Sequence, residues 1–172
     1  MKILSFLMQD FLVPVSSSNT GDVDRDLIVS RLNYIKSQEN FEWVYSHKVH
    51  YLNIPISFDI ETSSFYEGVA KKAIMYIWTC NVNGTTFIGR TWKQFTQLLD
   101  IISEVFELIR YNKRCLIYVH NLEYEFQFMR KWFDWHDIFA DDKRQPLYAV
   151  TKGGVEFRCS YRLSGYSLAK LA

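Results

Sequence analysis

Two acidic residues inside an apolar segment are the first feature of this sequence that could do chemistry. Asp59 and Glu61 lie two residues apart in the segment FDIET, so in an extended strand both side chains point to one face. Neighbouring carboxylates repel each other and lose hydration unless a cation compensates them. Hard oxygen ligands of this kind suit Mg²⁺ or Mn²⁺. The alternative is an exposed acidic pair at a strand end that binds nothing.

A second polar cluster, HNLEYE at residues 120–125, follows the apolar run RCLIYV. We expect the run to be a buried strand and the cluster to open a helix, a junction where ligand sites of α/β sheets commonly lie. If that strand lies parallel beside the FDIET strand, Glu125 faces Asp59 as a third carboxylate. Three carboxylates can hold two metal ions for phosphodiester hydrolysis. Glu123 competes for this position, or is a solvated acid favoured by the helix dipole.

Residue patterns predict the elements that position these groups. Apolar residues spaced three and four apart from Trp92 to Ile109 predict a helix, with Thr91 as its N-cap. Asn121 stands where it could cap the following helix, which we expect to run to about Phe133. The remaining predicted elements are strands at residues 51–63, 73–82 and 85–90 with a turn at Asn83-Gly84, a hairpin around Gly153-Gly154, and a short helix at the end.

The element order predicts an α/β fold with a mixed sheet flanked by helices. Three antiparallel strands come first, and a helical crossover, a further strand and a second helix follow. That is the order of a ribonuclease H-like fold, although many functions share such architectures. We expect residues 1–50 to form a lead-in with a short strand and a helix, and residues 51–172 to form the main domain.

Composition narrows the class of protein. A net charge of +1 gives no global attraction for nucleic acid, so phosphate binding would need local basic clusters or bound metal ions. Aromatic residues make up 17% of the chain, which a Phe- and Tyr-rich core explains and which base stacking could also use. Cys80, Cys115 and Cys159 show no paired spacing, which argues against a disulfide framework or a zinc site and fits an intracellular setting.

The two clusters together resemble a known family. FDIETSSF and YVHNLEYEFQF are similar to the first and second exonuclease motifs of viral and organellar family B DNA polymerases of the protein-primed group. The resemblance runs from about Ile54 to the last residue, because FRCSYRLSGYSLAKLA is similar to the segment after the second motif. It implies a DnaQ-like 3′→5′ exonuclease domain that proofreads by two-metal hydrolysis of the 3′ ends of single-stranded DNA.

The resemblance implies that Asp59, Glu61 and Glu125 are the catalytic residues and the ligands of Mg²⁺ or Mn²⁺. Glu125 stands where the family more often has Asp, so its carboxylate sits on an arm one methylene longer.

Five further residues match positions that contact the DNA strand in that family. The resemblance implies that Thr62, Asn121 and Tyr124 hold the 3′-terminal nucleotides. It implies further strand contacts for His120 and Ser160. Without the family, Asn121 would be a plain N-cap, Tyr124 core packing and His120 a core histidine. The five are Thr62, Asn121, Tyr124, His120 and Ser160.

The sequence also departs from the family. The third exonuclease motif, a Tyr followed by a metal-binding Asp, is absent, as are the polymerase palm and thumb motifs, and after Glu156 there is neither Asp nor Glu. We therefore expect the main domain to be C-terminally incomplete. Three carboxylates without that Tyr could bind DNA and metal yet hydrolyse slowly or not at all.

Three hypotheses follow. The leading one is an exonuclease domain or fragment of a family B polymerase, with single-stranded DNA, the remaining polymerase domains or a terminal protein as partners. The alternative is a weak or inactive exonuclease-like fragment that binds single-stranded DNA or a replication partner. The third is a ribonuclease H-like nuclease acting on RNA or flaps.

The sequence also bears on where the protein acts. Gln9 and Asp10 interrupt the opening apolar stretch, so we expect no signal peptide and no membrane segment. This fits an intracellular location, the host cytoplasm if the protein is viral. A basic cluster could line a strand channel or be a solvated surface, and its members are Lys143, Arg144, Arg158, Arg162 and Lys170.

Overall fold

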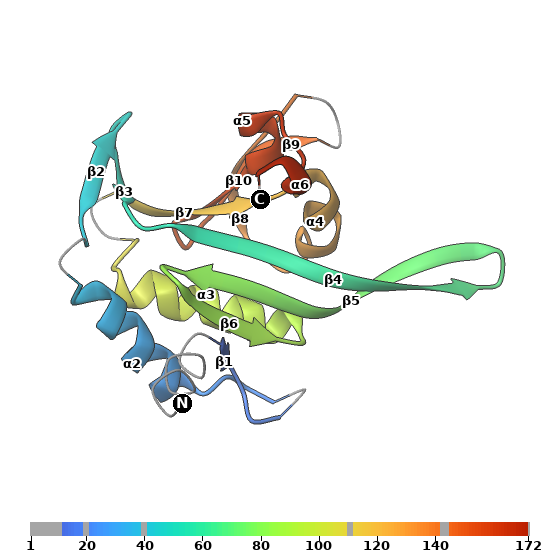
Figure 1. The fold of residues 1–172 in the computed structure, drawn as a ribbon, viewed down its shortest axis with the longest axis horizontal. Coiled ribbons are helices and arrows are strands. Elements are labelled where there is room, and N and C mark those ends of the chain that lie inside the picture. Colours follow the sequence, from blue (N-terminus) through green and yellow to red (C-terminus); the bar gives the residue numbers. More distant parts are fainter. Residues whose placement is uncertain (1–11, 19–20, 39–40, 110–111, 142–144, 172) are drawn as a thin grey trace.

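The computed structural model describes residues 12–18, 21–38, 41–109, 112–141 and 145–171. These residues build one mixed sheet of ten strands with helices packed against it (Figure 1). The strands are β1 (Leu12–Pro14), β2 (Trp43–Ser46), β3 (Val49–Leu52), β4 (Ile56–Glu67), β5 (Ala70–Val82), β6 (Thr85–Gly89), β7 (Lys113–Val119), β8 (Trp135–Ala140), β9 (Pro146–Thr151) and β10 (Val155–Cys159). The helices are α2 (Arg25–Lys36), α3 (Trp92–Val105), α4 (Leu122–Met129), α5 (Ser160–Ser164) and α6 (Leu168–Leu171).

The sheet runs in the order β1-β6-β5-β4-β7-β10-β9-β8. Strands β4, β5 and β6 form an antiparallel meander, and helix α3 then crosses to β7, which lies parallel to β4. Strand β10 is parallel to β7, and β9 and β8 follow antiparallel. The predicted α/β class, with a mixed sheet flanked by helices, is therefore confirmed.

Helix α3 forms where the sequence predicted it. The Thr91 hydroxyl accepts from the Gln94 backbone N–H at 3.1 Å, and the Gln94 side chain accepts from the Thr91 N–H at 3.2 Å. This capping box satisfies donors that the first helical turn leaves unpaired. The same Gln94 amide donates to the Gly21 carbonyl at 3.0 Å, which ties the loop before α2 to the start of α3.

An aromatic cluster joins α3 to the sheet. Phe95 is fully buried and stacks on Phe58 of β4, with 4.2 Å between ring centroids. Its ring also contacts Trp78 of β5 at 5.1 Å and Phe157 of β10 at 6.4 Å. Because these residues come from three strands, one helical side chain holds the middle of the sheet together. The high aromatic content is thus at least partly explained by the core.

The residues expected to form a lead-in belong to the same sheet and core. Strand β1 pairs with β6, and β3 pairs with the beginning of β7. Helix α2 is capped by Asp24, whose side chain accepts from the Leu27 N–H at 3.0 Å, and it packs on α3. The expected short strand and helix are therefore present, and residues 1–11 lie outside the described residues.

Several local predictions need correction. The strand expected at residues 51–63 is divided into β3 and β4 around Pro55, which has no backbone N–H to donate to a ladder. Helix α4 ends at Met129 rather than near Phe133. Asn121 makes no side-chain cap hydrogen bond, and its backbone is left-handed at φ 67°, whereas an N-cap residue is normally extended. Strands β2 and β8 and helix α5 were not predicted at all.

We predict that Phe95→Ala lowers the free energy of unfolding by about 3–5 kcal/mol, because it leaves a cavity between five aromatic side chains. Urea denaturation measures this. The matched control is Phe65→Ala on the exposed part of β4, expected within about 0.5 kcal/mol of the parent. Equal losses in the two variants would contradict this description of the core.

Candidate functional site

The pairing of β4 with β7 positions the site. Ser57 and Phe58 lie opposite Tyr118 and Val119 in parallel register. Strand β7 ends there and the chain turns into α4, whereas β4 continues with Asp59. The beginning of α4 therefore lies near the part of β4 that carries the carboxylates. The predicted parallel arrangement of these two segments is confirmed.

The inward face of α4 explains why Glu125 is buried. Leu122, Glu125 and Met129 are the buried residues of this helix, and they recur at spacings of three and four. That spacing puts all three on one face of the helix. The apolar residues at either end pack into the core and carry the carboxylate between them inward.

Glu125 is the most perturbed carboxylate among the described residues. Its side chain is 5% exposed, and Oε2 is buried without a hydrogen-bond partner. Burial raises the pKa of Glu125 to about 7, with a further increase from the charge of nearby Asp59, while a hydrogen bond from its own backbone N–H opposes the shift. The orphaned oxygen needs a proton or a cation to offset its lost hydration.

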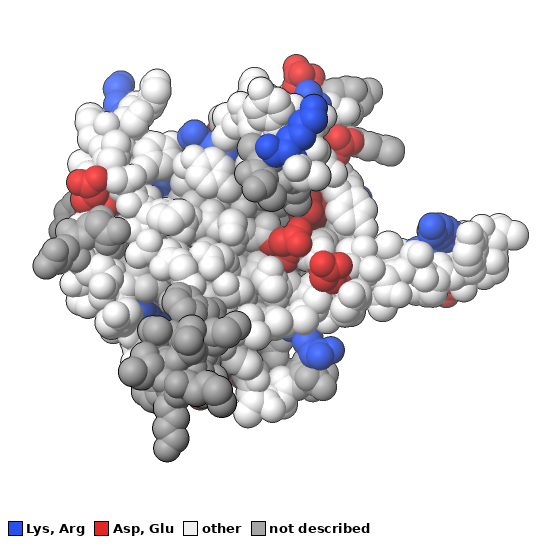
Figure 2. All heavy atoms as spheres, viewed as in Figure 1, with Lys and Arg blue, Asp and Glu red and all other residues white. Residues whose placement is uncertain are grey.

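Asp59 and Glu61 lie on the exposed side of β4, alternating with buried Phe58 and Ile60. Figure 2 shows acidic side chains gathered over β4, close to where the β4–β5 hairpin leaves the body of the protein. The expected shared face of the two carboxylates is confirmed by this alternation. Within the described residues, no three His, Cys, Asp or Glu side chains already form a group that could hold a metal ion. A three-carboxylate site would thus require side-chain rotation, which exposed Glu61 is free to make.

The residues predicted to contact DNA fall into two pairs. The hydroxyl of Thr62 on β4 is 2.7 Å from the hydroxyl of Tyr124 on α4, so this bond joins the two elements that carry the carboxylates. His120 Nδ1 lies 3.2 Å from Ser160 Oγ, and this second bond joins the end of β7 to α5. Asn121, between the pairs, is exposed.

A shallow hollow opens beside these residues. It has a volume of about 470 Å³ and is lined by Asn121, Glu123, Tyr124 and Gln127. Sequence reasoning missed Gln127, although its place on α4, three residues after Tyr124, could have revealed it. Glu123 faces this hollow rather than the core, which leaves Glu125 as the carboxylate beside Asp59.

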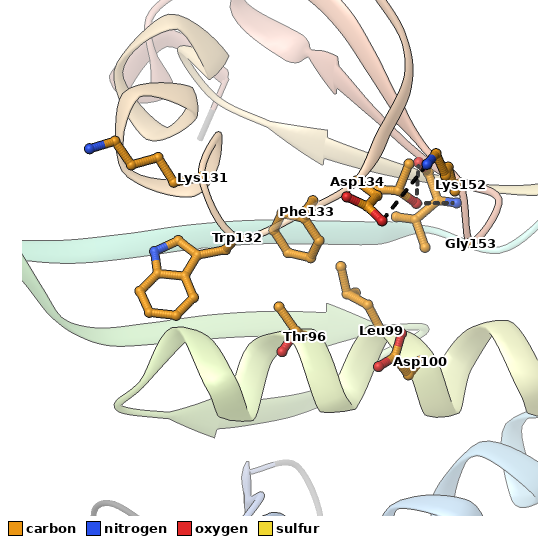
Figure 3. Close-up of a pocket in the computed structure, with 11 residues that line it drawn as sticks. Thr96, Leu99, Asp100, Lys131, Trp132, Phe133, Asp134, Lys152 and Gly153 are labelled. Atoms are coloured by element: carbon orange, nitrogen blue, oxygen red, sulfur yellow. Dashed lines mark hydrogen bonds and ion pairs between the residues drawn. The ribbon is translucent and has the colours of Figure 1, made fainter.

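A different pocket lies between α3 and the β8–β10 region. Its volume is about 460 Å³, and Trp132, Phe133, Asp100 and Lys152 are among its lining residues (Figure 3). The Lys152–Asp134 ion pair at its rim is 3.8 Å long and exposed to solvent. None of the predicted site residues lines this pocket. Partial burial raises the pKa of Asp100, but no second carboxylate among the described residues contributes to this increase, so we place the candidate site at β4 and α4.

The basic cluster of the C-terminal third is not a single surface. Arg158 donates through Nε to buried Glu156 at 2.6 Å, and Arg114 donates to the same carboxylate at 2.9 Å. These contacts hold the Arg158 guanidinium against buried Glu156, so part of its charge is already neutralised within the protein. Arg162 and Lys170 are exposed, and Lys143 and Arg144 lie outside the described residues.

Comparison of the chain with protein-family models, curated proteins and solved structures found no match. The described helices include none with the length and apolar character needed to cross a membrane. All three cysteines are free and buried.

We predict that Glu125→Gln stabilises the protein at alkaline pH. Glu125 ionises near 4.5 in the unfolded chain and near 7 in the folded protein. Its contribution to stability is therefore complete below pH 4.5 and is lost as the pH rises through about 7. The variant avoids this loss, so its free energy of unfolding at about pH 8 should exceed the parent's by on the order of 2 kcal/mol.

Urea denaturation between about pH 4 and pH 8 measures this difference. Glu123→Gln, which changes a less buried acid on the same helical turn, is the control and should show no pH-dependent gain. A difference between parent and Glu125→Gln that stays constant with pH would contradict the perturbed pKa.

Proposed function

We propose that the chain is a 3′→5′ exonuclease-like domain, related to those of family B DNA polymerases, that binds the 3′ end of single-stranded DNA and hydrolyses its last phosphodiester bond. One observation carries the proposal. Parallel pairing of β4 and β7 brings Asp59 beside Glu125, whose buried Oε2 has no partner. An unpaired carboxylate oxygen next to a second carboxylate is a natural place for a divalent cation.

The topology supports the same assignment. The central strands have the order β6-β5-β4-β7-β10, in which an antiparallel meander is followed by two strands parallel to β4. A ribonuclease H-like fold has this arrangement, and it would place the carboxylates on the central strand and on the helix after the next parallel strand. Asp59 and Glu125 occupy those two places.

The donor set fits Mg²⁺ or Mn²⁺, since Asp59, Glu61 and Glu125 offer only hard oxygen atoms. A pair of such ions supplies an activated water and stabilises the leaving 3′ oxygen. The carboxylates of this chain, exposed Asp59 and Glu61 and buried Glu125, would hold the ions. Ionisation of Glu125 near neutral pH would favour cation binding without a large energetic cost.

The remaining residues would position the strand. The Thr62–Tyr124 hydroxyl pair lies next to the carboxylates and offers a polar contact and an aromatic face to the terminal nucleotide. Tyr124 is 42% exposed, so its ring is accessible to a base. The Asn121 amide could donate to the sugar or the phosphate, and the His120–Ser160 pair would contact the strand further back.

A catalytically weak or inactive domain that binds the same strand end is the second candidate. Within the described residues, the three carboxylates are not gathered as a ready-made metal group, which favours binding over rapid hydrolysis. Both candidates use the same residues to hold DNA, so only an activity measurement separates them.

We predict that the protein releases mononucleotides from a 3′-labelled single strand in Mn²⁺, and that Asp59→Asn or Glu125→Gln lowers the rate by at least about 100-fold. The assay follows product length on denaturing gels. Glu123→Gln is the matched control, because it removes one negative charge from the same helix without touching the proposed ligands. Equal rates in all four proteins would sink the catalytic assignment. Strand binding without cleavage by the parent would select the second candidate.

A further inference from the structure

The β4–β5 hairpin extends well beyond the sheet. Residues 63–76, here called the arm, project away from the body of the protein (Figures 1 and 2). Its two strands pair with each other along its length: Ser63 lies opposite Ile74 at the base, and Glu67 lies opposite Ala70 beside the turn. The turn uses Gly68 at φ 61°. A two-stranded ribbon buries little surface and adds little to stability. Its length therefore calls for an explanation other than the core.

The arm carries an unusual amount of exposed apolar surface. Surface residues on a ribbon with no core to cover are normally polar, and a cluster of exposed apolar side chains commonly marks a binding site. Tyr66 is 72% exposed and Val69 is fully exposed. The exposed large apolar side chains of the arm are Phe65, Tyr66, Val69, Ile74 and Tyr76.

Charges on the arm favour an anionic partner. Lys71 and Lys72 follow the turn, and Glu67 precedes it. Both lysines are exposed, and Lys72 forms with Glu67 a solvent-exposed ion pair that a phosphate could replace, since such surface pairs contribute little to stability. Aromatic rings interleaved with lysines are suited to a single-stranded nucleic acid, because bases stack on the rings while phosphates meet the ammonium groups.

One side of the arm continues the face of β4 that carries Asp59 and Glu61, and the other continues the face of Thr62. Side chains alternate along β4, so Ser63 and Phe65 lie on the side of Asp59 and Glu61. The extra residue of the bulge, Tyr76, is in β5 and leaves this alternation of β4 intact. Lys72 is the cross-strand partner of Phe65, so it shares that side, whereas Tyr66 and Lys71 share the other.

The distance fits a short stretch of DNA. Phe65 lies four residues beyond Glu61, which is about 13 Å along a strand. Stacked nucleotides are spaced by roughly 3.4 Å, so a strand ending at the carboxylates would pass Phe65 about four nucleotides from its 3′ end.

We propose that the arm is a second contact for single-stranded DNA, with Phe65 stacking on a base and Lys72 meeting a phosphate upstream of the 3′ end. The inference rests on the proposed function for the position and direction of the strand. It adds a binding surface that gives the protein a preference for longer strands, which the site at Asp59 and Tyr124 alone could not provide.

Fluorescence anisotropy with labelled oligothymidylates of about three and about ten nucleotides, in EDTA to prevent cleavage, tests the arm. The parent is expected to bind the longer strand at least about 10-fold more tightly, and Phe65→Ala to remove most of that difference while leaving the affinity for the short strand unchanged. Tyr66→Ala, which removes the neighbouring ring on the opposite side, and Tyr34→Ala on α2 are matched controls expected to bind like the parent.

The ion pair provides an opposite test. Glu67→Gln frees Lys72, so it is expected to strengthen binding of the longer strand by about 3-fold, whereas Lys72→Ala should weaken it and make the salt dependence less steep. A preference for longer strands that survives both Phe65→Ala and Lys72→Ala would overturn the inference. So would a loss of long-strand affinity in Tyr66→Ala as large as that in Phe65→Ala.

The outcomes distinguish a failure of the arm contact from a failure of the proposed function. If Tyr124→Ala abolishes short-strand binding while Phe65→Ala leaves the length preference intact, the proposed function stands and the arm contact fails. If Phe65→Ala weakens the longer strand but Asp59 and Tyr124 variants bind and cleave like the parent, the arm binds DNA and the proposed site fails. If Phe65→Ala instead changes the molecular mass of the free protein in sedimentation, the arm joins two copies of the chain and the DNA contact is overturned.

Discussion

The short parallel contact between β4 and β7 is the constraint on which the rest of this structure depends. Only Ser57 and Phe58 of β4 pair with β7, yet this contact joins the antiparallel meander to the parallel half of the sheet. Phe95 of α3 packs against this contact, because its ring stacks on Phe58 of β4 and also contacts Phe157 of β10. Where β7 stops, β4 continues paired with β5 only, and the carboxylates lie at that point.

Burial of Glu125 is the energetic consequence of this geometry. The apolar residues at both ends of α4 draw the carboxylate inward, and the fold supplies no partner for its Oε2. Such an arrangement destabilises the ionised state, so a structural role alone would favour an apolar or amide side chain at this position. A buried carboxylate beside Asp59 is easier to understand as a group kept for chemistry. Glu156 shows the contrast, because it is equally buried but receives hydrogen bonds from Tyr51, Arg114 and Arg158.

Sequence patterns predicted the elements whose local chemistry is explicit. The helix after Thr91 was predictable from its spacing and capping residue, and the Asn83-Gly84 turn from its need for positive φ. The parallel β4–β7 contact followed from the crossover rule, and with it the nearness of Asp59 and Glu125. The helix and the turn were predictable because each depends on a few neighbouring residues, and the strand contact because the handedness of the crossover leaves few arrangements.

What sequence could not supply depends on tertiary context. The strand before the turn at Gly68 was predicted to end at Ser63 and the next to begin at Ala73, whereas β4 runs to Glu67 and β5 starts at Ala70. The pattern missed these ends because a ribbon exposed on both sides has no alternation between apolar and polar residues. Asn121 adopts a left-handed backbone that its position before a helix did not reveal. The Thr62–Tyr124 hydroxyl pair and the orphaned oxygen of Glu125 depend on contacts across 62 and more residues of chain, which no local pattern encodes.

Calorimetric titration with Mn²⁺ at about pH 6, repeated in two buffers of different ionisation enthalpy, tests the central claim most directly. If Asp59 and Glu125 form a cation site, the parent binds Mn²⁺ and releases up to about one proton per ion, because most Glu125 carboxyls are still protonated at that pH. Glu125→Gln should bind more weakly and release none. Absence of Mn²⁺ binding by the parent, or binding with the same proton release in Glu125→Gln, would contradict the account.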